Sequence, residues 1–272
     1  MRNQKINIKL IAGSVLLFSV IIFSFQSCKE KKKEVVEETK KPEKVADDGF
    51  VSIFDGKTLD NWKGDGIHWR AEDGSLVGEV TPSTLIKKNT FIIWQGGQPK
   101  DFELKAEFRI TEDGNSGINY RSELLDSIPN ALRGYQADID GQNRYTGQNY
   151  EERKRTTLAY RGEKAVITSQ KNPDEPGSLR ENVKNNAWQN RDVVESLGDS
   201  DSLKAKIKAE DWNKVHLIVQ GNKLQHYVNG ILMSEVIDDD TVNRSFSGWL
   251  GVQVHVGPPM KVEYKNIQLK KL

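Results

Sequence analysis

The sequence predicts an all-β domain, a two-sheet antiparallel sandwich, over residues 49–272. Short runs in which apolar and polar residues alternate recur along this stretch, as they do in strands with one buried face. Glycine, asparagine and aspartate lie between the runs, where tight turns are expected. The stretch is also long enough to form a single sandwich with a substantial core.

The most regular of these runs is Phe102–Ile110, in which apolar residues occupy even positions and charged residues odd ones. One face of this strand should therefore contact water. Asn229-Gly230 is the strongest hairpin signal, and Glu72-Asp73-Gly74 and Gly221-Asn222 mark two further turns. The expected strands cover residues 50–54, 69–71, 75–79, 91–94, 102–110, 118–121, 135–140, 215–220, 224–228, 231–236, 249–256 and 261–269.

Residues 170–211 do not follow this pattern. The segment is polar and contains Pro173, Pro176 and several asparagines. Residues 193–197 and 203–207 are the stretches that could form short elements. A segment of this length with little pattern indicates a functional loop or an insertion into the sandwich.

The N-terminus is typical of an exported protein. Lysines precede an apolar run over residues 10–25, and the small residue Ser27 comes directly before Cys28, the only cysteine. This arrangement resembles the signal of bacterial lipoproteins, which predicts a signal peptide over residues 1–27 and lipidation of Cys28. The protein would then be exported and anchored to a bacterial membrane. An uncleaved membrane anchor is the alternative, because the run is almost long enough to span a bilayer.

Composition and charge predict how residues 28–48 behave, and they argue against nucleic acid as a partner and against disulfides in the domain. Residues 28–48 are rich in lysine and glutamate and poor in apolar residues, which predicts a disordered tether before the folded domain. The net charge of the whole chain is +1, so no strong field attracts nucleic acid. Because Cys28 precedes the domain, the domain itself contains no disulfide and must rely on its core.

On three of the expected strands, one face carries polar residue types that are uncommon on an ordinary strand face exposed to water. Side chains alternate between the two faces of a strand, so the neighbours of each polar residue lie on the opposite, apolar face. If the three strands are neighbours, one sheet face brings together an acid, a base and a cation in a cleft. The alternative is an ordinary face exposed to water. The residues concerned are Asn119 and Arg121, then Gln136, Asp138 and Asp140, and finally Gln253 and His255.

Aromatic and histidine residues provide further candidates. His226 is in phase with apolar neighbours and is expected to pack inside, whereas His216 should lie at the surface or half-buried, and His68 could line a sugar site. Histidine and cysteine motifs with metal-ligand spacing are absent from the sequence. Four rings in expected loops could stack on sugars, with core packing as the alternative: Trp62, Trp94, Tyr145 and Trp188.

A series of motifs resembles the 3-keto-disaccharide hydrolase domain family, which is common in exported proteins of Bacteroidetes. The resemblance covers residues 49–272 and implies a jelly-roll sandwich of the concanavalin A-like lectin and glucanase type. The motifs are residues 49–62, 101–104, 114–118, 134–138, 212–213, 227–230 and 251–259.

This resemblance implies cleavage of glycosides already oxidised at C3 of the sugar. The ketone acidifies the C2 proton, so a base can start an elimination that releases the C1 substituent, and water can add afterwards. We expect Asp138 or His255 to be the base. Arg121, or a divalent metal held by His255 and a carboxylate such as Asp138, would stabilise the enolate. The expected substrate-binding residues are Asn119, Gln136, Asp140, Gln253, Tyr145 and Trp94.

Other functions of the same fold remain open at this point. A non-catalytic carbohydrate-binding module is one alternative, although acid, base and cation together favour an enzyme. A conventional glycosidase is another, but it needs two carboxylates flanking the bond, and the Glu-x-Asp-x-x-Glu motif of laminarinase-like jelly rolls is absent from the sequence. If the substrate is a keto-sugar, a partner sugar 3-dehydrogenase is expected to supply it.

Overall fold

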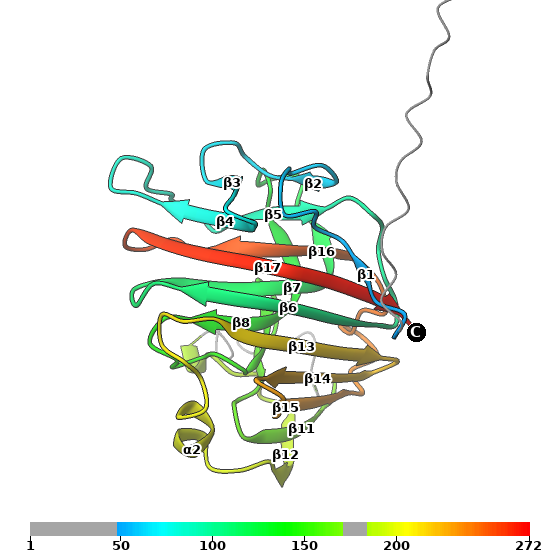
Figure 1. Cartoon of the computed structure of the whole chain (residues 1–272). Coiled ribbons are helices and arrows are strands. Elements are labelled where there is room, and N and C mark those ends of the chain that lie inside the picture. Colours follow the sequence, from blue (N-terminus) through cyan, green and yellow to red (C-terminus); the bar gives the residue numbers. More distant parts are fainter. Residues whose placement is uncertain (1–47, 171–183) are drawn as a thin grey trace, which may run out of the picture. The chain divides into compact units, whose positions relative to one another are not determined.

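The computed structural model describes residues 48–170 and 184–272 (Figure 1). The predicted signal peptide, Cys28 and nearly all of the predicted tether lie outside these residues, as does part of the 170–211 segment. Within the described ranges, no helix combines the length and the apolar character that a membrane crossing requires.

Two β-sheets form the domain, a large sheet of ten strands and a small sheet of seven. The large sheet has the order β12 (Arg191–Ser196), β11 (Glu163–Ile167), β15 (Ile231–Asp238), β14 (Lys223–Val228), β13 (Asn213–Gln220), β6 (Phe102–Ile110), β17 (Met260–Lys271), β4 (Ser75–Val80) and β3 (Trp69–Glu72), with β1 (Val51–Ser52) beside β17. The small sheet has the order β10 (Thr156–Ala159), β9 (Asn149–Glu152), β8 (Leu132–Asp140), β7 (Asn115–Leu124), β16 (Trp249–Val254), β5 (Thr90–Trp94) and β2 (Trp62–Lys63).

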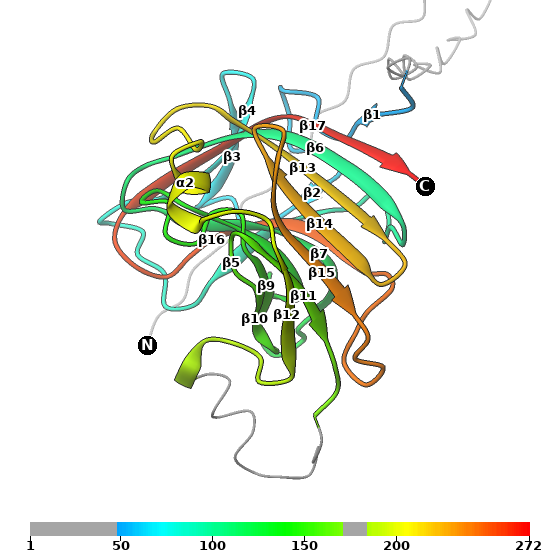
Figure 2. The same ribbon diagram turned by 90° about the horizontal axis from the view of Figure 1, so that it is seen from below.

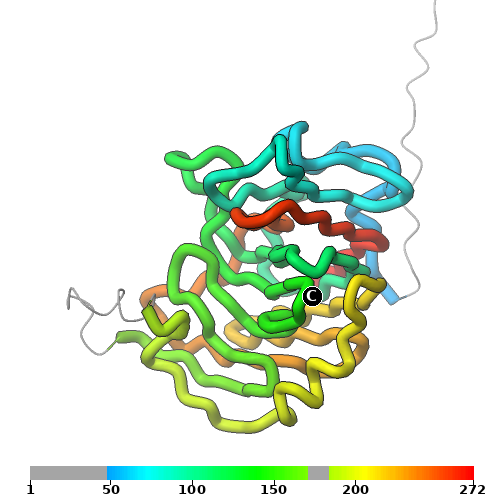
Figure 3. The backbone as a smooth tube through the Cα atoms, turned by 90° about the vertical axis from the view of Figure 1, so that its left-hand side faces the viewer, coloured from blue at the N-terminus to red at the C-terminus, as the bar shows by residue number. Residues whose placement is uncertain are grey.

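The pairing confirms the predicted two-sheet antiparallel sandwich. Only β11 and β15 pair in parallel among the strand pairs described. The layers are visible in Figure 2, where β13, β14 and β15 belong to one sheet and β5, β7 and β9 to the other. The C-terminal strand β17 lies between β4 and β6, so the end of the chain is inserted among strands from its first half (Figure 3).

Burial of alternate residues on β6 shows why this sequence forms a sandwich. Phe102, Leu104 and Phe108 are almost fully buried, whereas the charged residues between them remain partly exposed. The small sheet contributes Tyr120 and Ile139 to the same core. Each large apolar side chain buried in this way stabilises the fold by about 1.5–3 kcal/mol.

Several elements have no clear counterpart in the predicted pattern. The strands β2, β9, β10 and β11 are short, and β9 buries polar residues where alternation would suggest apolar ones. In the 170–211 segment, the predicted element at 193–197 overlaps β12. The one predicted at 203–207 overlaps the end of α2 (Ser200–Lys204), a helix capped by the Asp199 side chain.

A buried guanidinium joins the two sheets. Arg155, whose side chain is 1% exposed, follows β9 of the small sheet and forms an ion pair with Glu151. It also reaches the large sheet, where its Nη2 lies 2.6 Å from Asp238 Oδ2 and its Nη1 lies 3.2 Å from Asp240 Oδ2. The hydroxyl of Tyr135 donates to the same Asp238 oxygen at 2.5 Å. Arg155 therefore pairs with three buried carboxylates, of which Glu151 also has Lys154 Nζ at 3.4 Å.

We predict that Arg155→Leu lowers the free energy of unfolding by about 3–5 kcal/mol, because it leaves buried carboxylates without their cation. The matched control is Arg133→Ala, which removes an exposed partner of Glu123 and should change stability by about 1 kcal/mol or less. Urea unfolding followed by tryptophan fluorescence measures both. Equal effects of the two substitutions would show that the network does not stabilise the fold.

Candidate active site

The three strands with polar faces are neighbours, in the order β8-β7-β16. Asn119 on β7 pairs with Gln136 on β8, and Gly117 pairs with Asp138. Gln253 on β16 is close enough for its Nε2 to donate to Gln136 Oε1 at 3.3 Å. These side chains share the outer face of the small sheet, because residues such as Ile118 between them belong to the core.

A cavity of about 180 Å³, here called the first cavity, opens on this face. The strand β9 and the loop before it supply a further part of its wall that the sequence did not indicate. Tyr145 and Asn186 complete the lining. The other lining residues are Asn115, Gln136, Asp138, Gln148, Tyr150, Glu152 and His255.

Asp138 is the most perturbed acid of the first cavity. Its Oδ1 accepts from Gln136 Nε2 at 2.6 Å and its Oδ2 from Gln148 Nε2 at 2.5 Å. Burial raises the pKa of Asp138 to about 7, against the opposing effect of the two amides. Gly117 permits this arrangement, since a Cβ there would lie 2.6 Å from the Gln136 side chain.

Glu152 is a second acid in the same cavity, and sequence patterns gave no sign of it. Burial raises its pKa above the usual range. Asn89 Nδ2 donates to Glu152 Oε1 at 3.0 Å, while Asn89 Oδ1 accepts from the backbone N–H of Val256 at 2.9 Å. Asn89 thus links the acid to the segment that carries His255. The alternation of β9 could have suggested Glu152 only if that strand had been recognised.

His255 lies just after β16, at the edge of the first cavity. Its backbone N–H donates to Asn115 O at 3.2 Å, and its ring Nδ1 lies 2.6 Å from Val256 O. Because a carbonyl oxygen can only accept, Nδ1 carries the proton in the neutral ring. The other nitrogen, Nε2, is then free to exchange a proton with a substrate.

Asn119 and Gln253 lie beneath the cavity rather than in its lining. Both side chains are fully buried. Within the described part of the chain, neither polar atom of the Asn119 amide has a hydrogen-bond partner, and the same is true of Gln253 Oε1. Gln253 supports Gln136 through its amide, and direct contact of either residue with a substrate would require it to become accessible.

Asp140, a predicted sugar-binding residue, instead organises the loop that follows β8. Its Oδ1 accepts from the backbone N–H groups of Tyr145 and Thr146, at 2.8 and 3.0 Å, and its Oδ2 accepts from that of Arg144 at 3.0 Å. The carboxylate is 1% exposed. Its effect on the site therefore passes through the loop, which places Tyr145 in the first cavity.

Arg121 does not join the cluster, contrary to the sequence-based prediction. The pairing of β7 with β8 shifts between Tyr120 and Glu123, and Arg121 has a left-handed φ of 45°. The alternation of side chains breaks at this irregularity. The guanidinium instead donates to Lys100 O and Gly221 O and pairs with Asp101, so it holds loops together.

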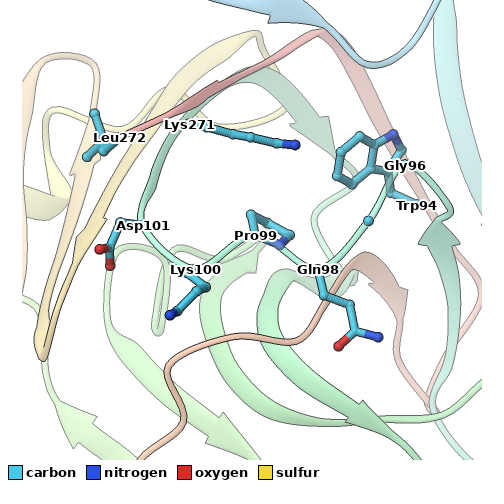
Figure 4. Close-up of a pocket in the computed structure, with 9 residues that line it drawn as sticks. Trp94, Gly96, Gln98, Pro99, Lys100, Asp101, Lys271 and Leu272 are labelled. Atoms are coloured by element: carbon cyan, nitrogen blue, oxygen red, sulfur yellow. The ribbon is translucent and has the colours of Figure 1, made fainter.

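The predicted aromatic residues also divide between two environments. Tyr145 is partly exposed in the first cavity, but Trp62, Trp94 and Trp188 are largely buried. Trp94 lines a different cavity of about 360 Å³, which Figure 4 shows beside Gln98 and Lys271. The core-packing alternative thus holds for the three tryptophans.

The remaining histidines have structural roles. His226 is buried, as expected, and its Nε2 lies 2.8 Å from the Tyr120 hydroxyl. His216 is half-buried beside Glu103. His68 binds Asp65 and the carbonyl of Thr84 and does not line the first cavity.

The fit of a divalent metal can be judged from the donor atoms. Within residues 48–170 and 184–272, no three His, Cys, Asp or Glu side chains are grouped so that they could hold a metal ion. Both oxygens of Asp138 already accept from glutamine amides. The donor set of Asp138 and His255 therefore does not fit a metal in this arrangement.

The fold and the first cavity together define a β-sandwich protein with an acidic, amide-rich site on the outer face of its small sheet. The chain belongs to the family of 3-keto-α-glucoside-1,2-lyase-like domains, whose model matches residues 49–270. This match confirms the resemblance found in the sequence.

Individual relatives resemble parts or all of the domain. A 3-keto-disaccharide hydrolase of Bacteroides thetaiotaomicron is 34% identical over 94 residues, which span 29% of this chain and only 30% of the relative. A putative glycosyl hydrolase of Parabacteroides distasonis has a crystal structure that aligns with a TM-score of 0.51 at 20% identity, covering 83% of this chain and 94% of the other. This structural likeness supports the sandwich fold.

We predict that Asp138→Asn becomes more stable relative to the wild type as the pH rises from 4 to 7. The unfolded chain loses the Asp138 proton near pH 4, whereas the folded protein keeps it up to about pH 7. Burial of Asp138 therefore lowers wild-type stability by about 1.4 kcal/mol for each pH unit in this window. Asparagine does not titrate and removes this dependence.

Urea unfolding of both proteins at pH 4, 5.5 and 7 measures the difference. Asp192→Asn, on the exposed strand β12, controls for the substitution itself. A stability difference between Asp138→Asn and the wild type that stays constant with pH would contradict the raised pKa.

Proposed function

We propose that the first cavity cleaves glycosides oxidised at C3 by eliminating the substituent at C1. The observation that carries the proposal is a carboxyl group with a pKa of about 7, Asp138, in one cavity with His255 and several amides. A base that titrates near neutrality suits the removal of a proton next to a ketone. Family membership supports the same chemistry.

The proposed reaction conserves all atoms and electrons. The Asp138 carboxylate takes the C2 proton, and the C–H electron pair forms the enolate of the C3 ketone. The enolate re-forms the ketone as a C1–C2 double bond forms and the C1–O bond breaks. Protonated His255 gives its proton to the departing oxygen, which leaves as an alcohol. Later addition of water to the double bond would give net hydrolysis.

A neutral hydrogen-bond donor would stabilise the enolate, because Arg121 does not line the first cavity. Tyr150 lines the first cavity, and burial raises the pKa of its hydroxyl, which keeps it protonated. A hydroxyl aimed at the developing charge is a suitable hydrogen-bond donor. Asn115 and Asn186 offer amides for sugar hydroxyls.

A conventional glycosidase is the second candidate, and Glu152 is the observation that favours it. Asp138 and Glu152 give the cavity the two carboxylates that ordinary glycoside hydrolysis uses. Substrates that have not been oxidised distinguish the two reactions, since elimination needs the ketone. A non-catalytic binding module would hold sugars without converting either kind of substrate.

The source of the oxidised substrate and the anchoring of the protein to a membrane are proposals as well. Because the substrate must be oxidised beforehand, a sugar 3-dehydrogenase acting as a separate partner would supply it. Lipidation of Cys28 would anchor the domain to the membrane of an exporting bacterium. Mass spectrometry of the membrane-bound protein tests this anchor independently of the sugar chemistry.

We predict that the wild type releases the aglycone from 3-keto-glucosides and that Asp138→Asn reduces kcat/KM by about 10²–10⁴-fold, as expected when a general base is lost. The wild-type rate should rise as the pH increases toward about 7, because Asp138 ionises over this range. NMR of the reaction mixture measures product formation.

Three controls make the result specific. Asp192→Asn should retain full activity, because its side chain is exposed on β12. A chelator should leave the rate unchanged if no metal takes part. Equal turnover of unoxidised glucosides would favour the conventional glycosidase, and sugar binding without turnover of any keto-glycoside would refute the proposal in favour of a binding module.

A further inference from the structure

Two paired residues of the large sheet reach across the core to the segment just before β9. His226 on β14 pairs directly with Ser234 on β15, and both side chains are buried. The His226 ring Nδ1 lies 3.2 Å from Gln148 O, and the Ser234 hydroxyl donates to Gly147 O at 2.8 Å. One cross-strand pair of the large sheet thus holds two consecutive carbonyl groups on the side of the small sheet.

Gln148, the residue that His226 contacts, also holds the buried acid of the first cavity. Its side-chain Nε2 donates to Asp138 Oδ2 at 2.5 Å, and its backbone O accepts from the Asp138 N–H at 3.4 Å. The Gly147 N–H donates to Asp138 O at 3.1 Å. The position of this backbone therefore determines how the Gln148 amide meets the carboxylate.

The surroundings of His226 fix the proton on its ring. A carbonyl oxygen can only accept, so Nδ1 carries the proton and donates to Gln148 O. The other nitrogen, Nε2, then accepts, and the Tyr120 hydroxyl at 2.8 Å and Asn149 Nδ2 at 3.3 Å are its donors. Burial lowers the pKa of His226 to about 4, so the ring is neutral at the pH where Asp138 titrates. An apolar side chain would fill the same space but would not donate to Gln148 O.

We propose that His226 is a positioning residue for the first cavity: through Gln148 O it holds the amide that binds Asp138, although its ring does not line the cavity. Donation from an amide favours the ionised carboxylate. It opposes burial, which raises the pKa of Asp138. Loss of the anchor should therefore leave less of the acid in its basic form at neutral pH. This inference rests on the proposed function only for its effect on turnover.

Other groups also act on Asp138, and the substitutions used to test the proposal leave them in place. After burial and the two glutamine amides, charge repulsion from Glu152 and Asp140 raises the pKa of Asp138 further. The remaining titratable residues of the cavity lining are Tyr145, Tyr150 and His255.

NMR of the carboxyl group tests the positioning role without relying on turnover. In protein labelled with ¹³C at the aspartate Cγ, the Asp138 signal is the one that Asp138→Asn removes. His226→Leu should raise the midpoint of its pH titration by about one pH unit, because the carboxylate loses much of an amide hydrogen bond. His226→Asn keeps an N–H donor near the place of Nδ1 and should restore a midpoint close to that of the wild type.

Tyr120→Phe is the matched control, because it removes a partner of His226 Nε2 and leaves Nδ1 on Gln148 O. It should disturb the core without moving the Asp138 midpoint. Ser234→Ala is a milder second variant, which keeps the test valid if His226→Leu does not fold. It releases Gly147 O and should raise the midpoint in the same direction.

The outcomes separate this inference from the proposed function. An Asp138 midpoint that keeps its wild-type value in His226→Leu and Ser234→Ala, or that moves equally far in Tyr120→Phe or His226→Asn, would show that His226 only fills the core. If elimination also takes place, the pH at which kcat/KM rises should move upward with the NMR midpoint in His226→Leu. If the midpoint moves but the wild type converts no keto-glycoside, the positioning role stands and the elimination proposal fails.

Discussion

The register of β9 is the constraint on which the rest of this structure depends. Glu151 faces the core and binds Arg155, which in turn binds carboxylates of the large sheet. Because side chains alternate, fixing Glu151 inside places Tyr150 and Glu152 on the outer face. A slip by one residue would bury the site residues and expose the network that joins the sheets. The ion-pair network of Arg155 and the candidate active site thus lie on opposite faces of one strand.

The same principle operates on β8, where Tyr135 faces inward and its hydroxyl binds Asp238. Gln136 and Asp138 consequently face outward. The strand therefore presents its acid on a rigid sheet that packing fixes from behind. Asp138 owes its high pKa to this setting, since burial beside Glu152 and against the sheet disfavours its charge more than two glutamine amides favour it.

Sequence reasoning succeeded where strands follow simple alternation. Residues 102–110 match β6, and the outward positions of Gln136 and Asp138 followed from period two alone. It failed on β9, where polar residues bury one another. From sequence alone Glu151 resembles a surface residue, and its burial is explained by the ion pair with Arg155. It also failed at Arg121, where an irregularity in pairing reverses the expected direction. Both failures arise from contacts that strand alternation does not contain, since Arg155 also binds Asp238 and Arg121 binds Asp101 and Gly221.

Asp140 shows how a residue can be essential to a site without facing it. Its carboxylate is fully occupied by the backbone of the loop after β8, so it acts only by fixing where consecutive residues point. That loop gives Tyr145 to the first cavity and Arg144 to an adjoining cavity of about 220 Å³. Asp138, two residues earlier, and this loop together place a buried acid and parts of both cavity linings in one short stretch of chain. A change in loop length would therefore alter both cavity linings while leaving Asp138 in its place on the sheet.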